Sequence, residues 1–215
     1  MGNRTNYYVD GFNLFRRALE HGPNRWLDLS ALFRTVFPDN EIHRIRYFTS
    51  WISGSSNPGK LERQALYVRA LETIPTLKLH YGEFHRNPVW RPLVRPIPGL
   101  PDSVEVWDTK EKGSDVNLAS MLLLDAHNRE FDAAIVVSND SDLLLPIKLV
   151  VSDFQKPVGV LDPAERGSHS LAAAATFYRR LHRSDLAKSQ FPGDMVDRHG
   201  PFRRPLRWDP QPDSN

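Results

Sequence analysis

The chain has 215 residues, of which 40% are hydrophobic and 25% charged, and its net charge is only +2 with a pI of about 8.9. No apolar stretch approaches the roughly 20 residues that span a bilayer, so we expect no membrane segment, and the polar N-terminus favours a cytoplasmic protein. The absence of cysteine excludes disulfides and thiolate metal sites. The basic pI permits a nucleic-acid partner without requiring one.

The first half of the chain alternates between strand and helix patterns. We expect strands at 6–10, 42–48 and 77–84, a short helix around 14–19, and longer helices at 29–36 and 60–74. Pro38 ends the first long helix, and the Gly/Ser-rich residues 53–59 form a flexible loop by composition. Residues 86–101 contain five prolines, three arginines and Trp90, which predicts an inserted loop or ragged hairpin.

The second half continues the alternation. We expect a strand near 104–107, a helix at 114–129, a strand at 132–138, a helix at 142–151, a strand at 157–161 and a helix at 170–181. A basic tail without periodicity follows. Alternating strands and helices indicate an α/β fold with a mostly parallel sheet between helices. We therefore predict one domain at 1–181, with its insertion at 86–101, and a C-terminal extension at 182–215.

Four aspartates fall at strand ends or at a helix start. Asp10 ends the first strand, Asp115 opens the helix predicted at 114–129, and Asp140 and Asp142 follow the strand at 132–138. The carboxyl ends of parallel strands converge on one crevice, so these acids are expected to meet. Because like charges repel, the cluster requires a cation, and oxygen-only ligands indicate Mg²⁺ or Mn²⁺.

A structural explanation competes for each acid. Asp10 and Asp115 are equally suited to capping a helix, where aspartate is favoured. A cap accounts for only one of Asp140 and Asp142, so that pair favours a ligand site. Asp125 lies about three turns beyond Asp115, and we interpret it as a surface residue.

Three motifs in this order resemble the NYN branch of the PIN-like nuclease superfamily, which includes relatives of the cyanobacterial regulator LabA. They are Tyr-Val-Asp-Gly-Phe-Asn-Leu at 8–14, Glu-Lys-Gly-Ser-Asp-Val-Asn-Leu at 111–118 and Val-Ser-Asn-Asp-Ser-Asp-Leu at 137–143. The resemblance implies a Rossmann-like three-layer α/β/α sandwich with a five-stranded sheet of order 3-2-1-4-5. It also implies a divalent-metal site that cleaves RNA, with the four aspartates as metal ligands and Asn13 as a supporting catalytic residue.

Single-stranded RNA is the expected partner, because basic grooves with aromatic platforms bind such strands. Candidate substrate contacts are Lys112, Ser138, Arg86, Trp90, Arg91 and Arg95. Arginine and proline in a loop also occur without any ligand. The sequence leaves the oligomeric state open, a homodimer included.

The sequence also allows functions other than a nuclease to be considered or excluded. The main alternative is a catalytically silent module that binds RNA or regulates another protein. An aspartyl phosphatase typically needs a second acid two residues after the first, and Phe12 occupies that position. Dinucleotide binding lacks its glycine-rich turn, since only Gly11 follows the first strand. A metal-free ribonuclease would need paired histidines, and only His80 and His85 are close in sequence.

Overall fold

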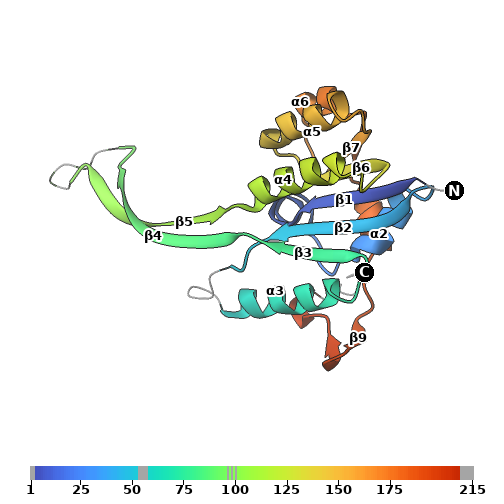
Figure 1. Cartoon of the computed structure of the whole chain (residues 1–215). Coiled ribbons are helices and arrows are strands. Elements are labelled where there is room, and N and C mark those ends of the chain that lie inside the picture. Colours follow the sequence, from blue (N-terminus) through green and yellow to red (C-terminus); the bar gives the residue numbers. More distant parts are fainter. Residues whose placement is uncertain (1–2, 53–57, 96, 98, 100, 209–215) are drawn as a thin grey trace.

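A parallel sheet organises the chain, and a computed structural model describes residues 3–52, 58–95, 97, 99 and 101–208. Within these residues six strands form the sheet in the order β3-β2-β1-β6-β7-β8 (Figure 1). Their bounds are β1 Arg4–Asp10, β2 Glu41–Thr49, β3 Leu77–Tyr81, β6 Ala133–Val137, β7 Val158–Asp162 and β8 Phe177–Arg180. Each neighbouring pair is parallel. The predicted α/β class with a mostly parallel sheet is therefore confirmed.

Helices cover both faces of this sheet. The described residues form seven α-helices, which are α1 Gly11–Leu14, α2 Leu29–Val36, α3 Pro58–Leu71, α4 Ser114–His127, α5 Leu144–Ser152, α6 His169–Ala174 and α7 Arg183–Lys188. A π-helical turn, η1 (Phe15–Leu19), extends α1, and 3-10 turns form η2 (Ser141–Leu143) and η3 (Leu206–Trp208). In Figure 1, α4, α5 and α6 lie on one side of the sheet and α3 on the other.

The side-chain alternation of β1 divides the core into two. Tyr7 and Val9 face α2, α3 and the C-terminal segment, whereas Tyr8 faces α4 and α5. All five residues of β6 and of β7 are buried, as expected for central parallel strands covered on both faces.

The sheet has one strand more than predicted, and its order includes β8 beyond the five-strand order 3-2-1-4-5. The helix expected at 170–181 ends at Ala174, and β8 pairs in parallel with β7. Thr176, Phe177 and Tyr178 are β-branched or aromatic residues that favour a strand once a partner strand is available. The preceding alanines continue the helical pattern, so the sequence did not indicate that the helix ends and a strand begins.

The segment after His182 is more regular than predicted. It contains α7 and an antiparallel hairpin of β9 (Asp194–Asp197) and β10 (Gly200–Arg203). Phe191, Phe202 and Trp208 are buried against Trp26, whose indole N–H donates to the Pro192 carbonyl at 2.8 Å. These aromatic contacts, distant in sequence, attach the segment to the core.

A long antiparallel ribbon replaces the predicted irregular insertion. β4 (Glu83–Pro92) pairs with β5 (Ser103–Lys112), and the ribbon projects away from the sheet (Figure 1). Of the two predicted forms, the hairpin is the one observed. The loop predicted at 53–59 falls largely on residues 53–57, which lie outside the described residues.

Candidate functional site at the strand ends

The order of the sheet reverses between β1 and β6. From β1 the chain adds β2 and β3 on one side, and then crosses to add β6, β7 and β8 on the other. In open α/β sheets, ligands bind outside the carboxyl ends of the strands at such a reversal. Asp10 ends β1, and Ser138 directly follows β6. Both predicted residues therefore lie at the position where this architecture places a ligand.

Asp10 is oriented by two hydrogen bonds. Its Oδ1 accepts the backbone N–H of Asn13 at 3.0 Å, which caps α1, and its Oδ2 accepts the Ser138 hydroxyl at 3.0 Å. The residue is only 4% exposed. The capping interpretation is thus correct for Asp10, but the cap uses one oxygen and leaves the other directed to β6.

Ser138 connects Asp10 with Asp140. The backbone N–H of Asp140 donates to the Ser138 hydroxyl oxygen at 3.1 Å, while that hydroxyl donates to Asp10. Asp140 also caps η2, because its Oδ1 accepts the N–H of Asp142 at 3.0 Å. Asp140 is partly buried and Asp142 is exposed. One serine hydroxyl therefore ties the ends of β1 and β6 together.

Asn13 and Asn139 extend this network across three strands. Asn13 Oδ1 accepts the N–H of Asn139 at 3.0 Å, and Asn139 Nδ2 donates to Asp162 Oδ2 at 2.7 Å. Asp162 ends β7, is fully buried, and also accepts the N–H of Ala164 and the hydroxyl of Tyr178. Sequence reasoning missed Asp162, although it ends an apolar run in the same way as Asp10.

Asp115 enters from α4, whose start lies at the same edge of the sheet. The Asn117 amide in the first turn of α4 donates to the Tyr81 carbonyl at the end of β3, at 3.5 Å. Gly113 precedes the helix with φ of 94°, a left-handed conformation that glycine adopts without strain. Lys112 ends β5 and is exposed beside this turn. The structure thus brings the element carrying Asp115 to the strand ends.

The carboxylate oxygens at this edge of the sheet suit a hard cation, but they do not surround a single position. The described residues contain no group of three or more His, Cys, Asp or Glu side chains that could hold a metal ion. Mg²⁺ is often held by only one or two carboxylates, with waters and phosphate oxygens as its other ligands. Asp10, and Asp140, whose backbone N–H bonds the same Ser138 hydroxyl, would supply that number of carboxylates. The full set of four aspartates stays a prediction.

The other predicted substrate residues lie on the ribbon. Trp90 is 66% exposed, whereas the Arg86 guanidinium stacks 4.3 Å from the Trp107 ring centroid and Arg91 pairs with Asp108 at 3.1 Å. Arg95 is exposed in the connection between β4 and β5. The ribbon begins directly after β3 and ends directly before α4, so its base lies at the edge of the predicted site.

Asp125 corrects a prediction, because it is buried and not on the surface. Its carboxylate accepts hydrogen bonds from Arg46 Nε and Nη2, each at 2.7 Å, and from the Tyr8 hydroxyl at 2.6 Å. Leu118, Leu122 and Asp125 recur at helical spacing, so Asp125 occupies a core position. Tyr8 and Arg46 lie inside the sheet, away from the strand ends.

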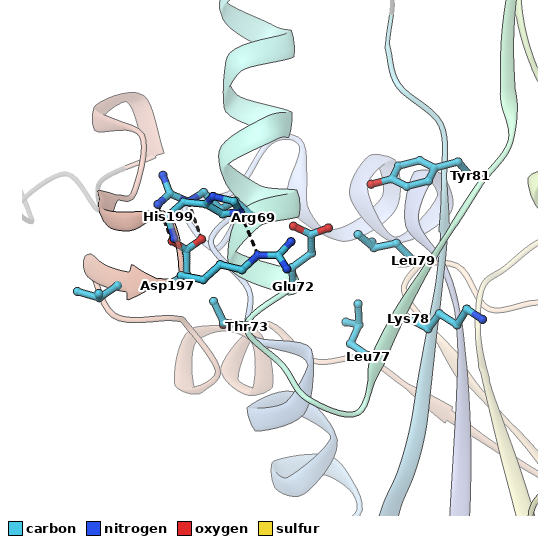
Figure 2. A pocket seen from close by; sticks show the side chains of 11 residues that line it. Arg69, Glu72, Thr73, Leu77, Lys78, Leu79, Tyr81, Asp197 and His199 are labelled. Carbon is cyan, nitrogen blue, oxygen red and sulfur yellow. Dashed lines mark hydrogen bonds and ion pairs between the residues drawn. The ribbon is translucent and has the colours of Figure 1, made fainter.

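A groove of about 730 Å³ lies between β3, α3 and the β9–β10 hairpin (Figure 2). Two hydrogen bonds from Arg69 to Asp197, each 2.7 Å, join two of its walls and hold the Asp197 pKa well below its usual range. Leu77, Leu79 and Tyr81 of β3 line it as well. The predicted acids are not part of this groove.

Comparison with known proteins supports the fold more than the activity. No protein-family model matches the chain. Over 240 aligned residues it is 28% identical to the 6-hydroxy-3-succinoylpyridine 3-monooxygenase HspA of Pseudomonas putida, covering 98% of this chain and 77% of that protein. A crystal structure of a protein of unknown function from Vibrio parahaemolyticus is similar, with a TM-score of 0.55 and 16% identity, covering 88% of this chain and 97% of that chain. At this identity the second likeness concerns the fold alone.

Regarding membranes, none of the helices in the described part of the chain combines the length and apolar character needed to cross one.

Proposed function

We propose that the protein is a metal-dependent endoribonuclease of the NYN, PIN-like type that hydrolyses single-stranded RNA in the cytoplasm. The observation that carries the proposal is the Ser138 hydroxyl at the reversal point of the sheet, which donates to the Asp10 carboxylate and accepts the backbone N–H of Asp140. The motifs that resemble the NYN family supply these residues. Capping uses only Asp10 Oδ1, and the second oxygen accepts the Ser138 hydroxyl, two residues before Asp140.

In this proposal Asp10 and Asp140 would hold Mg²⁺ or Mn²⁺, with Asp115 and Asp142 adding negative charge around the ion. Such an ion would supply a bound water of lowered pKa and would neutralise charge that develops on the phosphodiester. Asp10 is held ready for this role because the N–H of Asn13 and the hydroxyl of Ser138 fix both of its oxygens. Preorganised carboxylates need no rearrangement during the reaction. The expected products carry a 5′-phosphate and a 3′-hydroxyl.

Substrate binding is assigned to the base of the ribbon and its exposed face. Lys112 lies one residue before Gly113 and the α4 turn, where its ammonium can contact a phosphate. Trp90 is exposed and can stack on a base. Arg86 and Arg91 already have partners within the ribbon, so contact with RNA requires that they share or exchange these partners.

The test is incubation of the full chain with a mixed RNA pool and manganese, followed by mapping of the cleaved ends. Asp10→Asn and Asp140→Asn should each abolish cleavage while circular dichroism stays unchanged. Asp132→Asn is the matched control, because Asp132 is a partly exposed acid at the opposite end of β6 that pairs with Arg4. Full activity in excess chelator, or in both active-site variants, would refute the proposal. Binding without cleavage in the wild type would identify the silent RNA-binding module instead.

A second candidate follows from the Pseudomonas relative, whose name describes a monooxygenase acting on a succinoylpyridine. The likeness extends over nearly the whole chain, which makes oxygenation of this compound the next activity to assay. A monooxygenase inserts one atom of O₂ into its substrate and reduces the other to water with two electrons from a reduced nicotinamide or flavin. Oxygen uptake with 6-hydroxy-3-succinoylpyridine and a reduced cofactor, unaffected by Asp140→Asn, would favour this candidate over the nuclease.

A further inference from the structure

Two aromatic rings stack on each other at the ends of β2 and β3 and remain open to solvent. Trp51 follows β2 by two residues and Tyr81 ends β3, with ring centroids 5.6 Å apart and planes inclined by 13°. Each residue is 42% exposed. The stacked pair therefore exposes aromatic surface to solvent, and stacking on such a ring is favourable for another planar ring.

The side chain of Gln64 holds the backbone on both sides of Trp51. Gln64 of α3 donates from Nε2 to the Ser50 carbonyl at 2.8 Å and accepts the N–H of Ile52 on Oε1 at 3.0 Å. The amide of Gln64 therefore bridges the two peptide groups that flank Trp51. A ring presented from a fixed backbone loses little conformational entropy when a ligand stacks on it.

The register of the sheet places Tyr81 at the same edge as Asp10. In the strand register Asp10 of β1 is the partner of Phe48 of β2, and Phe48 is the partner of His80 of β3. Tyr81 is the next residue of β3. Two strand spacings separate β1 from β3, which is roughly 10 Å. The pair and the candidate acid thus share the same edge of the sheet.

The first turn of α4 connects Tyr81 of the aromatic pair with the region of Asp115. Asn117, two residues after Asp115, donates its side-chain amide to the Tyr81 carbonyl at 3.5 Å. Tyr81 also lines one end of the groove along β3 (Figure 2). Asp10 and Asp115 therefore both lie on elements adjacent to the pair.

We propose that Trp51 and Tyr81 form a stacking platform for a nucleobase of the RNA strand whose backbone reaches Asp10 and Asp140. This inference rests on the proposed ribonuclease function and adds the residues that seat the strand. Stacking on an aromatic face tolerates every base, so the platform positions the RNA without selecting a sequence. It differs from the ribbon residues because it lies within the sheet edge itself.

The test is RNA binding in the Asp140→Asn background with magnesium, which prevents turnover during the measurement. The probe is a fluorescein-labelled single-stranded oligoadenylate, followed by anisotropy. Trp51→Leu removes the ring and should raise Kd roughly five- to 150-fold, the range measured for loss of one stacked base. Trp51→Phe keeps a ring and should restore most of the affinity. The oligoadenylate should also quench tryptophan fluorescence in the parent protein, and this quenching should shrink in Trp51→Phe.

The outcomes separate the platform from the nuclease activity. Equal Kd values for Trp51→Leu and its parent, with manganese-dependent cleavage intact in the wild type, would overturn the platform and leave the proposed function standing. Equal loss of binding in Trp51→Leu and Trp51→Phe would also overturn it, since a structural role and not stacking would then explain the effect. Neither binding nor cleavage of any RNA by the wild type would overturn the nuclease proposal, and the platform with it.

Discussion

Removal of the Asp125 carboxylate should be among the most destabilising single changes in this protein. The side chains of Asp125 and Arg46 are only 4% and 8% exposed, and their two hydrogen bonds are both 2.7 Å long. In Asp125→Ala the Arg46 guanidinium stays buried beside His80, whose Nε2 lies 3.1 Å from Nη1. One imidazole nitrogen cannot replace a carboxylate as the partner of a buried cation.

The expected loss follows from comparable buried pairs. Breaking such a pair by removing one partner costs about 3–5 kcal/mol, a large share of a total stability of about 5–15 kcal/mol. With a urea m-value of about 2–3 kcal/mol/M, the unfolding midpoint should fall by about 1–2.5 M. Tyr8 also loses its acceptor at 2.6 Å, which adds to the penalty.

The assay is equilibrium urea unfolding of a double-mutant cycle. Asp125→Leu should lose several kcal/mol, whereas the double variant Arg46→Leu/Asp125→Leu should recover most of it, because no buried charge is left without a partner. A loss below about 1 kcal/mol in Asp125→Ala, or a double variant less stable than either single variant, would refute the reasoning.

Further predictions concern pH and packing. Burial, reinforced by Arg46, lowers the pKa of His80 from 6.5 to about 4. As pH falls, His80 is therefore protonated in the unfolded chain before it is protonated in the folded protein, so the free energy of unfolding should fall between about pH 6.5 and about pH 4. His80→Phe should flatten this pH dependence, measured by urea unfolding at each pH. An unchanged pH dependence in His80→Phe would contradict the argument. Gly11→Ala should cost about 1–3 kcal/mol in the same assay, because its Cβ would lie 2.6 Å from the Tyr47 ring. Gly22→Ala, with no atom closer than 3.8 Å, is the control and should be nearly neutral, so equal losses would contradict the argument.

Local sequence patterns were sufficient for the central strands and their terminal acids. The runs that became β1, β6 and β7 are apolar because both faces of a central parallel strand are covered. An acid directly after such a run must lie at the carboxyl end of the strand. Asp10 and Asp140 could be located in this way, and the same rule would have found Asp162.

Structural features that depend on partners distant in the chain could not be predicted from the sequence. Phe177 and Tyr178 follow a helical alanine run, and they form a strand because β7 offers an edge to pair with. Aspartate is a residue type usually found on the surface, but the guanidinium of Arg46, 79 residues earlier, pairs with Asp125 inside the core. Likewise, Trp208 is buried by contact with Trp26, and no local spacing signals that contact.

The amino-acid sequence alone determined the α/β class, the positions of most strands and the carboxylates that end them, because these depend on periodicity within a few residues. Tertiary structure decided which side chains meet: the Ser138 hydroxyl between Asp10 and Asp140, the Arg46–Asp125 pair, and the exposed stack of Trp51 on Tyr81. Such contacts join residues far apart in the chain, and their energy depends on burial and geometry that exist only after the sheet has formed.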